Sequence, residues 1–323
     1  MQLPPPVRRF LRGLPGLKGL HARLLATESE RDALRREVER LKVVNPLPPT
    51  WVPPGHFYSP IPPIEDLQRR SDSIFGPPAR SLPGIDLNEP GQLGLLREIA
   101  RFYPELPFPV TRTPPRRYFF ENPMYLYSDA ICLYGMLRLL RPRRVIEVGS
   151  GYSSAAILDT NDLFLEGRIR LTCIEPDPAI LRTLLLPGDQ DRVEILEIPV
   201  QDAPLDCFTA LQPGDILFID STHIVRTGGD VNDLLFRILP ALASGVYVHF
   251  HDVFYPFEYP RQWVFEGRAW NEDYALRAFL QYNAAFEIVL FNTFLETFHE
   301  PFFAQQMPLC LKNRGGSLWL RKR

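Results

Sequence analysis

The sequence lacks the features that would assign the protein to a membrane, secreted or nucleic-acid-binding class. No apolar run reaches the ~20 residues that span a bilayer, and residues 1–12 lack the apolar core of a signal peptide. The four cysteines show no Cys-x-x-Cys spacing. With a net charge of −2, the chain has no general excess of the basic residues that bind phosphate backbones. We therefore expect a cytoplasmic protein with reduced thiols, no membrane span and no nucleic-acid partner.

Residues 1–45 predict an amphipathic helix. Eight residues recur there in alternating steps of three and four, which is the spacing of a heptad seam. The seam consists of Leu17, Leu20, Leu24, Thr27, Arg31, Leu34, Val38 and Leu41. Thr27 and Arg31 interrupt its apolar character, so two interpretations stay open. The helix either forms a short coiled coil that joins copies of the chain into a homo-oligomer, or docks on the rest of the chain.

Residues 46–117 predict a proline-rich linker followed by an accessory or lid region. Eight prolines between positions 46 and 63 impose a stiff, extended path. The aromatic residues Trp51, Phe57 and Tyr58 favour a strap across a surface, with a plain spacer as the alternative. A second group of prolines ends this region, and we place the main domain at residues 118–323.

The stretch from Arg144 to Ala156 predicts a ligand-binding turn. A β-branched run over 145–148 reads as a buried strand, and the residues from Ser153 onward are compatible with a helix. Between them, Gly149 and Gly151 permit a positive φ and let a ligand approach the backbone. The first N–H groups of the helix would point at the same place.

Strands and helices alternate through the main domain, which predicts an α/β fold with a parallel sheet. The expected strands are residues 145–148, 169–174, 192–199, 215–219 and 245–250, followed by 286–291 and 317–320. The last two are joined by a loop and are expected to close the sheet as an antiparallel pair.

Four acids stand at or near the ends of four different predicted strands. They are Glu147, Glu175, Asp220 and Asp252. In an open α/β sheet the carboxyl ends of the strands converge on one crevice, so we expect these side chains to meet there. Because an unpaired buried charge is costly, carboxylates at these positions indicate a binding site.

Through Glu147-x-Gly149-x-Gly151-Tyr152-Ser153 and Glu175, residues 120–323 resemble the class I S-adenosylmethionine-dependent methyltransferases. The resemblance implies a Rossmann-like, seven-stranded sheet with helices on both faces, and S-adenosylmethionine as cofactor. The turn would hold the methionine part of the donor, Glu175 the ribose, and Gln201 and Asp202 the adenine side. The implied cofactor-binding residues are Glu147, Gly149, Ser150, Gly151, Tyr152, Ser153, Glu175, Gln201, Asp202 and Asp220.

A second resemblance, to the metal-dependent O-methyltransferases of the catechol and macrolide-sugar types, rests on residues 220–223 and 249–252. It implies a divalent metal ion on Asp220, His251 and Asp252. His251 stands where those families carry an acid, and imidazole suits Mn, Fe, Ni or Zn better than Mg²⁺. Three residues after Asp220, at the position of the general base, stands His223. The implied catalytic residues are therefore His223, Asp220 and His251.

These resemblances predict O-methylation of a hydroxyl on a sugar-containing or other polar small molecule. The aromatic residues between Val253 and Trp270 would form the acceptor wall. Three alternatives stay open: a metal-independent N-methyltransferase of a small molecule or peptide, a non-catalytic donor-binding adaptor, and a nicotinamide-dependent enzyme. The last is disfavoured because the third glycine of the dinucleotide fingerprint falls on Ser154.

Overall fold

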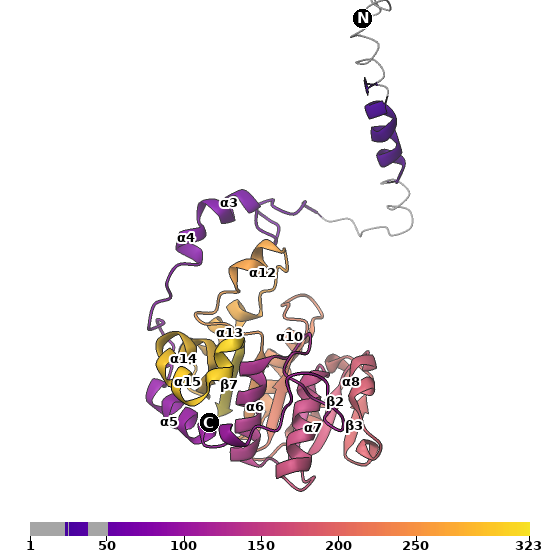
Figure 1. Ribbon diagram of the computed structural model, residues 1–323. Coiled ribbons are helices and arrows are strands. Elements are labelled where there is room, and N and C mark those ends of the chain that lie inside the picture. The colour runs from indigo at the N-terminus through magenta and orange to yellow at the C-terminus, as the bar shows by residue number, and fades with distance from the viewer. Residues whose placement is uncertain (1–22, 25, 38–50) are drawn as a thin grey trace, which may run out of the picture. The chain divides into compact units, whose positions relative to one another are not determined.

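The computed structural model describes residues 23–24, 26–37 and 51–323 (Figure 1). Contacts divide the chain into two compact units, Met1–Pro63 and Ile64–Arg323. The accessory region after Pro63 therefore belongs to the same unit as the main domain, and residue 117 is not a boundary between units.

In the first unit, the described residues between 23 and 37 are helical, as predicted. Leu24 and Leu34 of the predicted seam are exposed, and Leu17, Leu20, Val38 and Leu41 lie outside the described residues. Further along, the rings of Trp51 and Tyr58 stack with centroids 4.9 Å apart. Self-association and the strap stay predictions.

The second unit is built on a seven-stranded sheet, and this confirms the predicted fold class. The strand order is β3-β2-β1-β4-β5-β7-β6, with β7 antiparallel to both of its neighbours. The strands are β1 (Arg144–Val148), β2 (Arg170–Ile174), β3 (Val193–Leu196), β4 (Ile216–Ile219), β5 (Tyr247–His251), β6 (Phe286–Phe291) and β7 (Ser317–Lys322). Because β1 to β5 are parallel, their carboxyl ends lie along one edge.

Helices connect the strands and cover the sheet. The longer ones are α5 (Glu89–Ala100), α6 (Tyr127–Leu140), α7 (Tyr152–Phe164) and α13 (Glu272–Leu280). Shorter helices are α3 (Ile64–Arg69), α4 (Ser71–Ile74), α8 (Ala179–Leu184), α9 (Leu205–Thr209), α10 (Asp230–Asp233), α11 (Leu239–Ala241), α12 (Arg261–Phe265), α14 (Asn292–Phe298) and α15 (Glu300–Gln306). Single turns are η1 (Tyr103–Glu105), η2 (Asp189–Asp191), η3 (Val200–Asp202) and η5 (Pro308–Lys312), and η4 (Leu234–Ile238) is a π-helical stretch. Helices α5, α6, α7 and α8 contact one another in that order and form one layer.

The connection between β6 and β7 differs from the predicted loop. It contains α14, α15 and η5, which bury Phe294, Leu295 and Phe303. The apolar residues of this stretch alternate with prolines and polar residues too irregularly for a helical period to stand out in the sequence.

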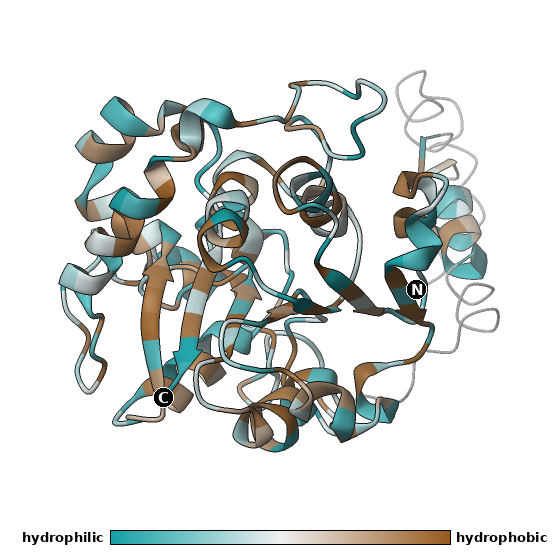
Figure 2. Ribbon diagram, turned by 90° about the horizontal axis from the view of Figure 1, so that it is seen from below, coloured by the Kyte–Doolittle hydropathy of each residue, from teal (hydrophilic) through white to brown (hydrophobic). Residues whose placement is uncertain are grey.

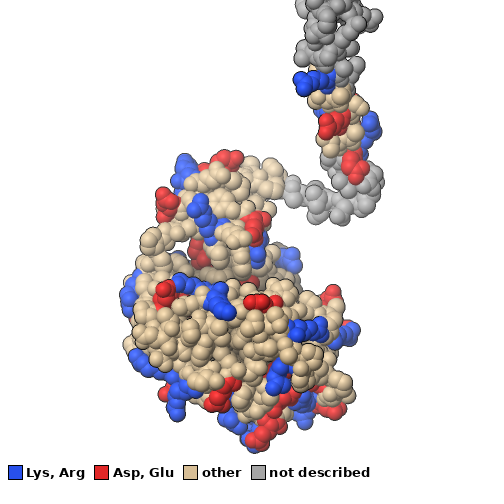
Figure 3. Space-filling view, viewed as in Figure 1, with Lys and Arg blue, Asp and Glu red and all other residues tan. Residues whose placement is uncertain are grey.

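The sheet forms the centre of the hydrophobic core. Buried strand residues such as Val145, Leu171, Phe218 and Val248 are at most 1% exposed, and the strands are coloured brown along much of their length (Figure 2). No helix among the described residues has the length and apolar character to cross a membrane. On the face of the second unit that Figure 3 shows, basic and acidic side chains are interspersed.

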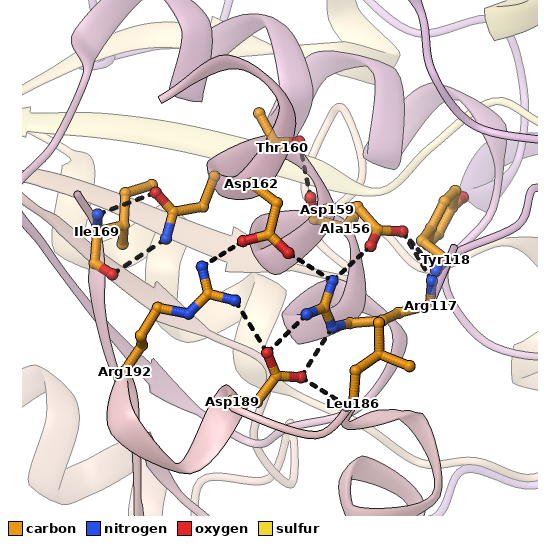
Figure 4. A network of polar contacts seen from close by, with 11 residues as sticks. Arg117, Tyr118, Ala156, Asp159, Thr160, Asp162, Ile169, Leu186, Asp189 and Arg192 are labelled. Atoms are coloured by element: carbon orange, nitrogen blue, oxygen red, sulfur yellow. Dashed lines mark hydrogen bonds and ion pairs between the residues drawn. The ribbon is translucent and has the colours of Figure 1, made fainter. Parts of the chain in front are cut away.

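A buried arginine fastens the segment that leads into α6. The guanidinium of Arg117 bonds to Asp159 at 2.8 Å, to Asp162 at 2.9 Å and to both oxygens of Asp189, the nearer at 2.6 Å (Figure 4). Burial alone would lower the pKa of Arg117, but hydrogen bonds to Asp189 and Asp159 raise it. The segment is thus tied to α7 and η2.

Replacing Arg117 by Gln should reduce the free energy of unfolding by about 3–5 kcal/mol, because it leaves buried carboxylates without their cation. Arg117 and Asp189 have side chains only 3% and 1% exposed, so water cannot compensate. Urea denaturation of wild type and variant measures the difference. Arg168→Gln, which removes an exposed arginine paired with Glu166, is the control; an equal effect of both substitutions would contradict the assignment.

Candidate active site

A tight turn joins β1 to α7. Gly149 has φ +83°, and a Cβ atom placed on it would lie 1.8 Å from the carbonyl oxygen of Asp220. Its N–H donates to the carbonyl of Ile174, and the N–H of Asp220 donates to the carbonyl of Val148. Only glycine fits at position 149, where the ends of β1, β2 and β4 meet. Gly151 has an extended φ of 171°, so the predicted positive φ applies to Gly149 alone.

Glu147 lies beneath this turn. It is fully buried, and its two carboxylate oxygens accept hydrogen bonds from Ser153, at 2.6 Å, and from Ser154. Burial raises the pKa of Glu147 to about 7, although both hydroxyls act against this. The carboxylate therefore supports the turn from below, and the predicted role of Glu147 in binding the cofactor stays a prediction.

A cavity of about 330 Å³ opens at the carboxyl ends of β1, β2 and β4. The described residues that line it are Val148, Gly149, Ile174, Glu175, Pro176, Pro199, Val200, Gln201, Asp220, Ser221, Thr222, Arg226 and Asp230. Four of the predicted cofactor-binding residues are thus brought together here. A larger cavity of about 430 Å³ lies beside Arg144 and Arg170, at the amino ends of β1 and β2, where none of the strand-end acids reaches it.

The cavity has the polar groups that a nucleoside-containing donor requires. Glu175 accepts a hydrogen bond from the N–H of Ser150 at 3.3 Å. The hydroxyls of Ser150 and Ser221 are buried but have no hydrogen-bond partner within the described part of the chain. Ser221 lines the cavity, and Ser150 is the chain neighbour of Gly149, which also lines it. Because buried hydroxyls are normally paired, a bound polar ligand would satisfy that of Ser221. On this observation the residues present fit S-adenosylmethionine.

Other predicted cofactor residues lie outside the cavity lining. Asp202 is exposed at the last position of η3. Ser153 is buried and bonded to Glu147. Tyr152 begins α7, where its ring packs edge-on against Phe119 with centroids 5.7 Å apart. Their contacts with the donor stay predictions.

The ends of β4 and β5 hold a cluster of carboxylates around one imidazole. Nε2 of His223 lies 3.4 Å from Oδ1 of Asp220 and 3.8 Å from Oδ2 of Asp252, and Nδ1 lies 2.9 Å from Oε2 of Glu272. His223 and Asp252 have positive φ angles of 60° and 56°. Left-handed backbone is uncommon for residues other than glycine, although His and Asp adopt it more readily than most, and its concentration here is typical of functional sites.

The cluster holds His223 in its charged form. Burial would lower the pKa of His223, but hydrogen bonds and charges from Asp220 and Glu272 raise it to about 11. Burial would likewise raise the pKa of Asp220, but His251 and His223 lower it below its usual value. At neutral pH the site therefore contains an imidazolium facing an ionised carboxylate.

His251 points to the other side of the cluster. Its Nε2 lies 3.5 Å from Oδ1 of Asp252, and its ring packs against Tyr125 with centroids 5.0 Å apart. Burial would lower the pKa of His251, whereas Asp252 and Asp220 raise it. All the predicted catalytic and metal-binding residues are thus neighbours.

The geometry of the predicted metal ligands does not form an ion site. No group of three or more His, Cys, Asp or Glu side chains in residues 23–24, 26–37 and 51–323 has an arrangement that could hold a metal ion. The imidazolium of His223 lies between the carboxylates of Asp220 and Asp252, where it supplies the positive charge. Such an ion would therefore require the cluster to rearrange.

Sequence reasoning missed the role of Glu272, whereas Trp270 was expected only as part of the acceptor wall. Glu272 is separated from His223 by 49 positions in the chain. The ring of Trp270 packs against the imidazole of His223, with centroids 4.4 Å apart. An acid at the start of a helix such as α13 is common for electrostatic reasons alone, so the sequence carried no signal for its role.

Comparisons with known proteins agree with this architecture. A family model described as a methyltransferase domain matches residues 146–253. An uncharacterised protein from Archaeoglobus fulgidus is 36% identical over 167 residues, covering 50% of this chain and 73% of the relative.

Solved structures with similar folds include a methyltransferase from Podospora anserina bound to S-adenosylhomocysteine. It has a TM-score of 0.41 at 15% identity, covering 85% of this chain and 100% of that one. An O-methyltransferase of tomaymycin synthesis from Streptomyces achromogenes, in complex with S-adenosylmethionine, has a TM-score of 0.36 at 18% identity, covering 71% and 89%. Likenesses of this strength assign neither a substrate nor a metal.

Replacing Glu147 by Gln should remove a pH dependence of stability. Because the pKa of Glu147 is about 7 in the folded protein and ordinarily 4.5, the folded state loses stability as the pH rises through this interval. The loss is about 3 kcal/mol in wild type, and the variant should escape it. Urea denaturation at pH 4 and pH 8 measures this. Glu194→Gln, on β3, is the matched control; parallel curves for wild type and Glu147→Gln would contradict the assignment.

Proposed function

The chain belongs to the class I S-adenosylmethionine-dependent methyltransferases, and on that premise we propose that it methylates a hydroxyl group of a polar small molecule. The observation that carries the proposal is the adjacency of two features. The cavity that fits the donor shares Asp220 with the cluster of His223 and Asp252. A donor site and a proton-handling site therefore have one residue in common.

We assign the donor to the cavity at the carboxyl ends of β1, β2 and β4. When bound, S-adenosylmethionine supplies a methyl group already activated by its positive sulfur. Gly149 lets the ligand approach the backbone, Glu175 accepts hydrogen bonds from ribose hydroxyls, and Gln201 borders the adenine side. The unpartnered hydroxyl of Ser221 adds a polar group to the cavity lining. The protein contributes alignment and exclusion of water.

We assign the acceptor hydroxyl to the space beside His223. The hydroxyl must lose its proton as it attacks, and the imidazole is the proposed acceptor of that proton. At neutral pH His223 carries a proton, so the imidazole acts as a base only in its deprotonated form. Asp220 and Glu272 hold the ring in place from opposite sides.

The metal ion on Asp220, His251 and Asp252 stays a prediction, and the chemistry proposed above routes no step through it. A sugar-containing acceptor and a cytoplasmic location likewise stay predictions. The runner-up functions are the metal-independent N-methyltransferase and the donor-binding adaptor. Both would keep the donor cavity.

Transfer of a labelled methyl group to hydroxyl acceptors, compared with their amine analogues, tests the proposal directly. Label in an O-methyl product supports it. Label in N-methyl products alone would instead support the N-methyltransferase. Tight donor binding without any transfer across sugars, phenols and amines would support the adaptor.

Replacing Glu175 by Ala should weaken binding of S-adenosylhomocysteine roughly 10- to 100-fold, because a charged hydrogen-bond acceptor for the ribose is lost. Isothermal titration calorimetry measures the affinity. Glu197→Ala removes a comparable acid just past β3, where it pairs with exposed Arg182, and should leave the affinity unchanged. An unaltered affinity of Glu175→Ala would remove this residue from the donor site.

Turnover of wild type should rise about tenfold per pH unit between pH 7 and pH 9, because the deprotonated fraction of His223 grows in that proportion below a pKa of about 11. His223→Gln should be slower by about 10²- to 10⁴-fold and should lose this slope. The pH profile of kcat measures both effects. His299→Gln, which replaces another carboxylate-paired histidine, is the control; a slope retained in His223→Gln would place the base elsewhere.

A further inference from the structure

Four aromatic rings form a closed group next to the cluster of His223. Trp263 contacts Phe254 with ring centroids 5.1 Å apart and Trp270 with centroids 5.4 Å apart. Tyr259 contacts both Trp270, at 6.0 Å, and Phe254, at 6.4 Å. Each ring thus meets the next nearly edge to face. We call Phe254, Tyr259, Trp263 and Trp270 the aromatic quartet.

The guanidinium group of Arg268 lies over two rings of the quartet. Cζ of Arg268 lies 3.9 Å from the ring centroid of Trp263 and 5.2 Å from that of Trp270. The backbone on both sides of this residue is left-handed, with φ +81° at Gly267 and φ 50° at Ala269. This backbone is unfavourable for alanine, so the loop that presents Arg268 is held in an uncommon conformation.

The quartet faces the reacting end of the proposed acceptor site. Trp270 packs against the imidazole of His223 with centroids 4.4 Å apart. The side chain of Arg268 is 36% exposed, and its only hydrogen bonds within residues 51–323 go to Glu266, two positions away. Glu266 is itself 42% exposed, so this ion pair contributes little to holding Arg268 in place. The cost of displacing the guanidinium is therefore set mainly by its contacts with Trp263 and Trp270, which a cationic ligand would replace.

We propose that the quartet is a subsite for a cationic group of the acceptor, and that Arg268 occupies it in the absence of ligand. The inference rests on the proposed function and narrows its substrate class. The acceptor would carry an ammonium, quaternary ammonium or guanidinium group in addition to the hydroxyl that is methylated. Aromatic faces attract such cations by 0.5–2 kcal/mol or more, depending on desolvation.

The charges around the quartet favour a cation over an anion. Asp273 accepts a hydrogen bond from the N–H of Phe254, and Glu258 accepts one from the N–H of Tyr259 and another from the hydroxyl of Tyr274. Asp252 follows β5 directly before the quartet begins. Burial raises the pKa of Asp273 and of Asp252, so Glu258 is the acid among these that disfavours an anionic acceptor. A cationic group would take over the charge that the guanidinium supplies.

Binding of guanidinium chloride to an Arg268→Ala variant tests the inference. Tryptophan fluorescence reports on Trp263 and Trp270, and urea serves as the neutral probe of similar shape, both at non-denaturing concentrations and constant ionic strength. We expect saturable binding of guanidinium to Arg268→Ala with a Kd at least tenfold lower than for wild type, and no saturable response to urea. Trp263→Ala in the Arg268→Ala background should abolish the response.

The matched control is Arg261→Ala, which removes an arginine that lies 5.5 Å from the ring of Phe265, outside the quartet. The inference is overturned if Arg268→Ala binds guanidinium no more tightly than wild type and Arg261→Ala do. It is also overturned if Arg268→Ala binds urea as well as it binds guanidinium. Arg268→Gln keeps most of the side-chain stem and must show the same gain, so the test stands if the alanine variant fails to fold.

The experiments distinguish a failure of this inference from a failure of the proposed function. Guanidinium binding to Arg268→Ala without methylation of any hydroxyl would remove the proposed function and keep the subsite. Hydroxyl methylation by wild type without guanidinium binding to either variant would keep the function and remove the subsite.

Discussion

The site depends on the electrostatic interaction between the imidazolium of His223 and the carboxylates around it. Three carboxylates, those of Asp220, Asp252 and Glu272, lie within 4 Å of its two ring nitrogens. Without the cation, these acids would repel one another in a largely buried space, and burial would force them to take up protons. The charge balance therefore keeps the ends of β4 and β5 and the start of α13 together.

Backbone geometry at the strand ends follows from the same crowding. Gly149 lets the turn after β1 approach the carbonyl of Asp220, and Glu147 fixes that turn from beneath through Ser153 and Ser154. Farther along the edge, His223 adopts a left-handed conformation, and its carbonyl accepts hydrogen bonds from the N–H groups of Asn271, just before α13, and of Glu272, its first residue. The unfavourable φ angle is thus offset by contacts that aim the imidazole at the carboxylates.

Sequence patterns predicted the sheet well because each strand carries a local apolar signal. The acids at the strand ends were also predictable, since parallel strands bring their carboxyl ends together. What could not be predicted depends on contacts between distant residues. Glu272 approaches His223 only because α13 folds back, and Arg117 finds Asp159 and Asp189 only through tertiary packing. Likewise, the motif alone could not separate Glu147, which supports the turn, from Glu175, which lines the cavity.

Charge connects the chemistry of this site with its selectivity. A base surrounded by carboxylates is strong when deprotonated, because the carboxylates stabilise the proton it accepts. The same carboxylates make the surroundings attractive to cations, and the aromatic quartet provides uncharged faces on which a cation can rest. Arg268 already uses those faces in the free protein. An acceptor with a positive charge would therefore bind on the quartet in place of Arg268, with its hydroxyl beside the imidazole that takes the hydroxyl proton.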